Sequence, residues 1–315
     1  MKNIRKVKSM NSVIISTRKA IGYRLLALGL STMLGGCAVD DPVGSETINL
    51  QDTKIAFNKD RGNRWDIFLI NPDGIGERFL VSYAWDPCWS PDGNWIVYVD
   101  DGWLEIVNIL DADITRNAKV LEKSRFGDHH ALGGPAWSPD GTTILFFADA
   151  GGNTDIFAID PDDTHLVNIT NSPENETDPA WSRDGSKIVY NRTKYDVTRL
   201  YVMNADGSDR KAVIFTYGFP AWSLDENIFT YFNDTGIYNV LPGAARDRCI
   251  VYPSEGYSMT GFSWAPTGNQ LVYTNSSRVQ GELIIYDTKD GTSRRISENI
   301  TKKAHPAWSP VILKD

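Results

Sequence analysis

The stretch DPAWSRDGSKIVY at residues 178–190 decides the fold, because the chain repeats it several times. Close copies lie at 86–98 (DPCWSPDGNWIVY) and 134–146 (GPAWSPDGTTILF), weaker copies at 219–231 and 261–273, and a shortened copy, HPAWSPVIL, at 305–313. The tryptophans of these copies, spaced 41 to 48 residues apart, are Trp89, Trp137, Trp181, Trp222, Trp264 and Trp308. Such a period matches one four-stranded blade of a β-propeller, so the repeated phrase indicates architecture rather than a catalytic motif.

Each repeat unit is predicted to contain four strands. In the unit that begins at residue 178, a short strand starts beside a Pro, and SRDG then forms a turn whose Gly allows a positive φ. The β-branched and aromatic residues of KIVY and of RLYVM (199–203) predict the second and third strands, and NADG (204–207) turns the chain into a fourth. No convincing amphipathic helix follows residue 37.

The two ends of the repeat array predict how the ring closes. The first unit (54–80) has no PAWS segment before it, and the last PAWS segment (305–309) is followed by only a few residues. We therefore expect an all-β domain over residues 52–315, a six-bladed propeller in which the C-terminal segment supplies the innermost strand of the first blade. This pairing would leave neither sheet edge open.

Residues 1–36 have the features of an export signal. Seven Lys or Arg and no acidic residue precede or flank the apolar run LLALGLSTML, which is too short to span a bilayer. The following LGGC (34–37) resembles the signal of bacterial lipoproteins, and this resemblance implies that Cys37 becomes the lipidated N-terminus. Residues 37–51 would then form a flexible tether. Ala38 stands where inner-membrane lipoproteins often have Asp, so we expect anchoring at the outer membrane, facing the periplasm.

The charge balance excludes one class of partner. The leader holds seven positive charges, so the formal charge of −8 for the whole chain becomes about −15 once it is removed. An acidic surface repels phosphate backbones, and we expect no nucleic acid as a partner and membrane contact only through the lipid. Cys88 and Cys249 are predicted to be separate small core residues, with a disulfide as the alternative.

The repeated PAWSPDG and DIF segments resemble the WD40-like repeat units of TolB-type β-propellers, which are common in bacterial envelopes. The resemblance covers nearly all of residues 52–310. TolB itself carries an α/β domain before its propeller, whereas about 14 residues separate Cys37 from the first expected strand here. The resemblance therefore implies an envelope propeller without that domain, and it does not carry over a role in the Tol–Pal system.

No catalytic residue is predicted. The segment GYSMTG (256–261) lacks the Gly-x-Ser-x-Gly spacing of a nucleophile elbow and lies between two expected strands rather than between a strand and a helix. Peptidases of the prolyl oligopeptidase type need a separate hydrolase domain, and the ring leaves no residues for one.

The loops that lead into the first strands are expected to meet at one mouth of the central channel. They contribute the candidate binding residues Tyr83, Trp85, Asp86, His129, His130, Glu176, Asp178, Tyr217, Phe219, Tyr257 and His305. Aromatic side chains mixed with charges suit contact with a protein, or with a glycan. The favoured prediction is a non-catalytic module without a cofactor that binds an envelope protein.

The histidines give an alternative from a different class. His129, His130 and His305, with nearby carboxylates, could hold a divalent transition metal. Oligogalacturonate lyases, which share this kind of propeller, use a His-held metal, although their ligand pattern does not match here residue by residue. The alternative function is thus a metal-assisted polysaccharide lyase or hydrolase, and the simpler interpretation is that these histidines are solvated loop residues.

Overall fold

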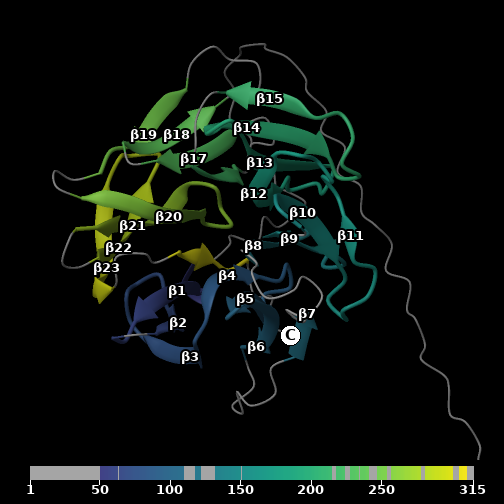
Figure 1. Cartoon of the computed structure of the whole chain (residues 1–315). Coiled ribbons are helices and arrows are strands. Elements are labelled where there is room, and N and C mark those ends of the chain that lie inside the picture. The colour runs from purple at the N-terminus through teal and green to yellow at the C-terminus, as the bar shows by residue number, and fades with distance from the viewer. Residues whose placement is uncertain are drawn as a thin grey trace, which may run out of the picture. The chain divides into compact units, whose positions relative to one another are not determined.

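Short runs of β-branched and aromatic residues between Gly- and Asp-containing turns form the strands of this protein. The computed structural model describes residues 50–62, 64–109, 118–121, 132–149, 151–214, 218–223, 228–233, 235–240, 247–253, 257–277, 281–300 and 305–310. Within these ranges the chain forms a 3-10 turn, η1 (Leu50–Asp52), and 24 strands in six four-stranded sheets. Figure 1 shows these sheets arranged as blades around a centre.

Strands occupy equivalent positions in all six blades, which are numbered from the blade that contains β1 and are given in that order below. The first strands are β24 (Ala307–Trp308), β4 (Trp85–Trp89), β8 (Leu132–Trp137), β12 (Asn175–Trp181), β16 (Phe219–Trp222) and β20 (Ser258–Trp264). The second strands are β1 (Ile55–Asp60), β5 (Trp95–Asp100), β9 (Ile144–Asp149), β13 (Lys187–Lys194), β17 (Phe229–Asn233) and β21 (Gln270–Ser276). The third strands are β2 (Trp65–Ile70), β6 (Trp103–Asn108), β10 (Thr154–Ile159), β14 (Val197–Asn204), β18 (Gly236–Val240) and β22 (Gly281–Asp287). The outer strands are β3 (Arg78–Ser82), β7 (Ala118–Leu121), β11 (Val167–Asn168), β15 (Lys211–Ile214), β19 (Arg248–Val251) and β23 (Ser293–Ile300).

The first strands surround a central channel. A cavity of about 560 Å³ is lined by residues of all six first strands and of the turns that follow them, among them Pro135, Pro179 and Ala307. The predicted all-β, six-bladed propeller of four-stranded blades is confirmed.

The ring closes through the C-terminal segment, as predicted. Strand β24 pairs antiparallel with β1, with Trp308 opposite Ile55, and the Ser309 N–H donates to the Lys54 carbonyl at 2.8 Å. In Figure 1 the yellow C-terminal strand accordingly lies among the purple and blue N-terminal strands. The first blade is therefore built from both ends of the domain.

The repeat tryptophans join neighbouring blades. Trp181 Nε1 donates to the Ala136 carbonyl of the preceding blade at 3.2 Å, and Trp89 Nε1 donates to the Ala307 carbonyl at 3.0 Å. Trp222 Nε1 likewise donates to the Ala180 carbonyl of the preceding blade at 3.2 Å. Since the indole bonds span two sheets, the tryptophan of the motif is used for assembly.

The serine and aspartate of the motif fix the turns after β4, β8 and β12. Ser138 Oγ donates to Asp140 Oδ1 at 2.6 Å and accepts from the Thr143 N–H at 2.9 Å. Gly141 has a φ of +76°, in the left-handed region that favours glycine. The same bonds recur in the turn at 182–187. The most repeated residues of this chain are thus structural.

Apolar side chains fill the spaces between blades. One cluster joins the first and second blades through Leu69, Trp89 and Tyr98, all nearly inaccessible to solvent. Another joins the first and sixth blades through Phe57 and Trp308. Both faces of the inner strands are therefore covered, which explains their continuous apolar runs.

The two described cysteines do not pair. Cys88 and Cys249 are free thiols, and both are half-buried. The prediction of two separate cysteines is confirmed, and burial raises the pKa of the Cys88 thiol.

The described strands all belong to one compact unit, Thr47–Asp315. Among the described residues, no helix is both long and apolar enough to cross a membrane. The predicted signal peptide (1–36) and Cys37 lie outside the described residues and stay predictions. At the far end of the expected tether, Leu50 packs against the apolar cluster between the first and sixth blades.

Candidate functional site

One position of the repeat lies at the same level in every blade. Counting back three residues from each repeat tryptophan gives Asp86, Gly134, Asp178, Phe219, Gly261 and His305. In β4, β8, β12 and β20 the ladder shifts register around this position, which marks a β-bulge. A bulge redirects side chains at the rim of a sheet, so the position is suited to present different groups at the channel mouth.

Three of these side chains come together. His305 Nδ1 lies 2.5 Å from Asp86 Oδ1, and the ring of Phe219 meets the His305 imidazole edge-on with 5.3 Å between centroids. Asp86 and His305 belong to adjacent blades, whereas Phe219 comes from the fifth blade. The predicted convergence of Asp86, His305 and Phe219 is thus present in the structure.

The pKa values of the two aspartates at the mouth, Asp86 and Asp178, are shifted in opposite directions. Burial would raise the pKa of Asp86, but the charge and hydrogen bond of His305 and the Gly134 N–H outweigh it and hold that pKa below its ordinary value. At Asp178, burial and the negative charge of Asp86 outweigh the hydrogen bonds from Thr177 and Asn191, and the pKa is raised. The mouth therefore holds one firmly ionised carboxylate beside one that takes up a proton more readily.

A cavity of about 430 Å³ opens beside the ion pair. Its lining residues are Asn58, Trp65, Trp85, Asp86 and His305. Two indoles next to a carboxylate and an imidazole combine apolar area with a few fixed polar groups, which is the composition of a binding pocket. Trp85 and the charged pair were predicted from the sequence, whereas Asn58 and Trp65 were not.

Tyr83 lies on the segment that leads into β4. It is 57% exposed, and the Arg64 guanidinium lies 5.4 Å from the centroid of its ring. Its φ of +59°, in the short connection between β3 and β4, lies in the left-handed region and is uncommon for an aromatic residue. Phe219 is also exposed, at 42%, so aromatic surface is available on this face.

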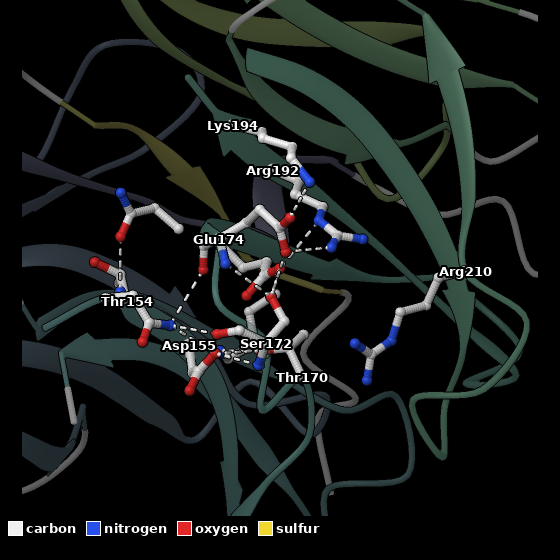
Figure 2. Close-up of polar contacts among 12 residues, drawn as sticks. Thr154, Asp155, Thr170, Ser172, Glu174, Arg192, Lys194 and Arg210 are labelled. Carbon is white, nitrogen blue, oxygen red and sulfur yellow. Dashed lines mark hydrogen bonds and ion pairs between the residues drawn. The ribbon is translucent and has the colours of Figure 1, made fainter. Parts of the chain in front are cut away.

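Glu176 belongs to a different group of side chains, which includes Ser172 and Arg192. Figure 2 shows polar contacts of Ser172, Glu174, Arg192 and Lys194 in this part of the molecule. It is fully buried, accepts a hydrogen bond from Ser172 Oγ at 2.5 Å, and lies 3.4 Å from Arg192 Nε. Burial raises its pKa to about 6. By contrast, hydrogen bonds from Lys194 and Arg192 lower the pKa of Glu174 to about 2.

Other predicted residues are less informative. Tyr257 is half-buried just before β20. His129, His130 and Tyr217 lie outside the described residues. Among the residues that the structure describes, no group of three or more His, Cys, Asp or Glu side chains is arranged to hold a metal ion. The metal alternative depends on His129 and His130 and stays a prediction.

The repeats, the four-stranded blades and the closed ring agree with one protein family. The sequence profile of the TolB beta propeller domain matches residues 48–312, and the chain belongs to this family. The resemblance inferred from the PAWSPDG repeats is confirmed.

Two known proteins resemble this chain, one over less than half of its length and the other over most of it. The uncharacterized peptidase YuxL of Bacillus subtilis is 24% identical over 145 residues, which are 45% of this chain and 21% of that relative. The chain thus matches about a fifth of the relative's length. The crystal structure of TolB from Acinetobacter baumannii has a TM-score of 0.67 and 19% identity, covering 83% of this chain and 68% of that one. This likeness shows the shared fold.

Oligogalacturonate lyase from Vibrio parahaemolyticus is a more distant structural neighbour. Its structure has a TM-score of 0.51 and 13% identity, covering 77% of this chain and 74% of that one. This likeness extends to the fold alone.

Proposed function

We propose that this chain is a non-catalytic binding module that holds a protein partner of the bacterial envelope at its channel-mouth face. The proposal includes lipidation of Cys37 and anchoring at the outer membrane, with the propeller in the periplasm. Membership of the TolB beta propeller family supports an envelope role, and the signal-like residues 1–36 support export.

The observation that carries the proposal is the 430 Å³ cavity between Trp65, Trp85 and the Asp86–His305 pair. Tryptophan is among the residues that contribute most to binding at protein interfaces, where it fills pockets surrounded by polar groups. Exposed Tyr83 and Phe219 lie on the same face and extend the apolar surface around that anchor.

The test begins with crosslinking of the full-length protein in intact cells and identification of the crosslinked partner. The affinity of the purified pair is then measured for wild type, Trp85→Ala and Asp86→Asn. A residue that anchors an interface costs about 2 kcal/mol or more when truncated, so Trp85→Ala should weaken binding about 30-fold.

Trp95→Ala is the matched control. Trp95 is 36% exposed and lies at the other end of β5, beside the turn after β4, whereas Val99 of the same strand pairs with Trp85. The control should bind as the wild type does. Equal binding by Trp85→Ala, Asp86→Asn and wild type, with all three folded, would remove this face from consideration.

Elemental analysis separates the proposal from a metal-dependent lyase. We expect the purified protein to bind its partner whether or not metal is removed. About one equivalent of transition metal, lost when His129, His130 and His305 are replaced by Ala, would favour the enzyme instead.

A further inference from the structure

A second cavity lies on the fourth blade, beside the hairpin of β13 and β14. It has a volume of about 300 Å³ and is lined by Glu174, Arg192, Lys194, Tyr195, Arg199 and Tyr201. Three cations and one carboxylate line it, in a chain whose formal net charge is −8. This local excess of positive charge favours an anionic ligand.

Two of the three cations, Arg192 and Lys194, are held in place by carboxylates. Glu174 Oε2 accepts from Arg192 Nη2 at 2.5 Å, and Glu174 Oε1 accepts from Lys194 Nζ at 2.7 Å. Figure 2 shows both side chains directed at Glu174, which is 8% exposed. Arg192 Nε also lies 3.4 Å from Oε1 of the buried Glu176. Arg192 also lies over the Tyr201 ring, 5.2 Å from its centroid. A fixed guanidinium loses little conformational freedom when a ligand carboxylate binds.

Tyr195 gives the cavity an exposed aromatic wall. It is 88% exposed, and it forms the two-residue turn between β13 and β14 with Asp196. The φ values of these residues are +49° and +63°, as in a type I′ turn, which joins the strands tightly. Lys194 Nζ lies 5.5 Å from the centroid of the tyrosine ring. The ring is thereby presented beside the cations on a short, paired hairpin.

This hairpin reaches the face that carries the channel mouth. Thr193, near the end of β13, pairs with Asn175 at the start of β12, and Asp178 follows on the same strand. One strand, β12, thus links the edge of the cavity to Asp178 of the channel mouth. Tyr and Arg are both enriched at protein interfaces, and Arg binds carboxylates through two parallel hydrogen bonds.

We propose that the blade-4 cavity binds the side-chain carboxylates of an acidic protein segment, with Arg192, Arg199 and Lys194 as the charge partners and Tyr195 as the apolar contact. As part of the partner interface it rests on the proposed function, but its chemistry can be tested without the partner.

The test uses the full-length protein and a fluorescein-labelled, C-terminally amidated tetraglutamate peptide, with tetraglutamine carrying the same label as the neutral probe. Fluorescence anisotropy at low ionic strength should detect tetraglutamate binding that weakens as salt is added. Lys194→Met should weaken it about tenfold, the size of one charge-assisted hydrogen bond. Lys211→Met is the control, because Lys211 lies on β15 of the same blade, 67% exposed and paired with Asp209, and should leave binding unchanged.

Glu174→Gln is the second variant, and it should bind tetraglutamate several-fold more tightly, because Arg192 and Lys194 lose a competing carboxylate. A purely structural role for Glu174 would not produce tighter binding. Equal affinity for the two peptides, or equal losses in Lys194→Met and Lys211→Met, would overturn the proposal. Binding of sodium glucuronate or inorganic phosphate with no binding of tetraglutamate would also overturn it and assign the cavity to a sugar acid or phosphate. Because the peptide replaces the partner, this result is independent of whether Trp85→Ala abolishes partner binding.

Discussion

Replacing Trp308 with Ala should destabilise the whole ring, because this side chain closes it. Trp308 is 5% exposed, packs between the first and sixth blades, and donates from Nε1 to Thr53 Oγ1 at 2.8 Å. Its N–H donates to Ser263 Oγ of the sixth blade at 2.9 Å. Removal of a buried tryptophan costs about 3–5 kcal/mol, a large part of the 5–15 kcal/mol that typically stabilises a domain.

Truncation after Lys303 should have a larger effect. It removes the indole and also the Ala307 carbonyl that accepts from Trp89, the Ser309 N–H bonded to Lys54, and the Ser309 Oγ that accepts from the Lys54 N–H. At about 1 kcal/mol for each hydrogen bond, the loss approaches the stability of the domain.

Urea unfolding followed by tryptophan fluorescence and by far-UV circular dichroism measures both variants. Trp95→Ala is the control, because Trp95 is 36% exposed and joins no blades through its indole in the described structure. A cooperative transition at the wild-type midpoint for Trp308→Ala, or for the chain truncated after Lys303, would refute closure by the C-terminal strand.

Two further predictions concern a buried carboxyl and the N-terminus. Burial raises the pKa of Glu176 to about 6, above its value of about 4.3 in an unfolded chain. The folded state therefore holds this proton more tightly, and stability should fall as pH rises from about 4 to 6. Relative to Glu176→Gln, the wild type should lose about 2 kcal/mol over this range, measured by urea unfolding at each pH, and parallel curves would contradict the assignment. Separately, Cys37→Ser should release the protein from the membrane fraction and abolish the mass increase of lipidation, whereas an unchanged fraction and mass would exclude the anchor.

The fold could be predicted because its determinants repeat. Trp181, its serine and its turn glycine recur in sequence at blade spacing. In the structure the indoles of Trp89, Trp181 and Trp222 each donate to an alanine carbonyl of the preceding blade, and the serine–aspartate turn recurs after β4, β8 and β12. Closure of the ring was also predictable. The first repeat unit lacks its first strand, and the C-terminal segment supplies a first strand that has no further unit after it. Both inferences used patterns rather than particular side-chain contacts.

The candidate site could be predicted only in part. Asp86, Phe219 and His305 lie at one repeat position, so alignment of the copies places them together. Trp65 escapes such an alignment, because it lies at the start of a third strand and reaches the mouth cavity from there. The same holds for Arg192 and Arg199, whose importance comes from cross-strand pairing between β13 and β14.

Gly134, Asp86 and Asp178 occupy the same repeat position at the channel mouth, but their side chains differ. Gly134 has a φ of +57°, and the aspartates at the same position in two other blades, Asp86 and Asp178, have φ values of +53° and +54°. Glycine adopts this left-handed backbone without steric cost, whereas a residue with a side chain is disfavoured there. The repeat thus satisfies the bulge with glycine in one blade and with a less favourable residue in two. Since the fold does not require a carboxylate there, the carboxylates are explained by what they contact: His305 for Asp86, and Asn191 for Asp178. These contacts lie at the channel mouth, where the residue at this repeat position differs from blade to blade, and this variation supports the proposed binding face.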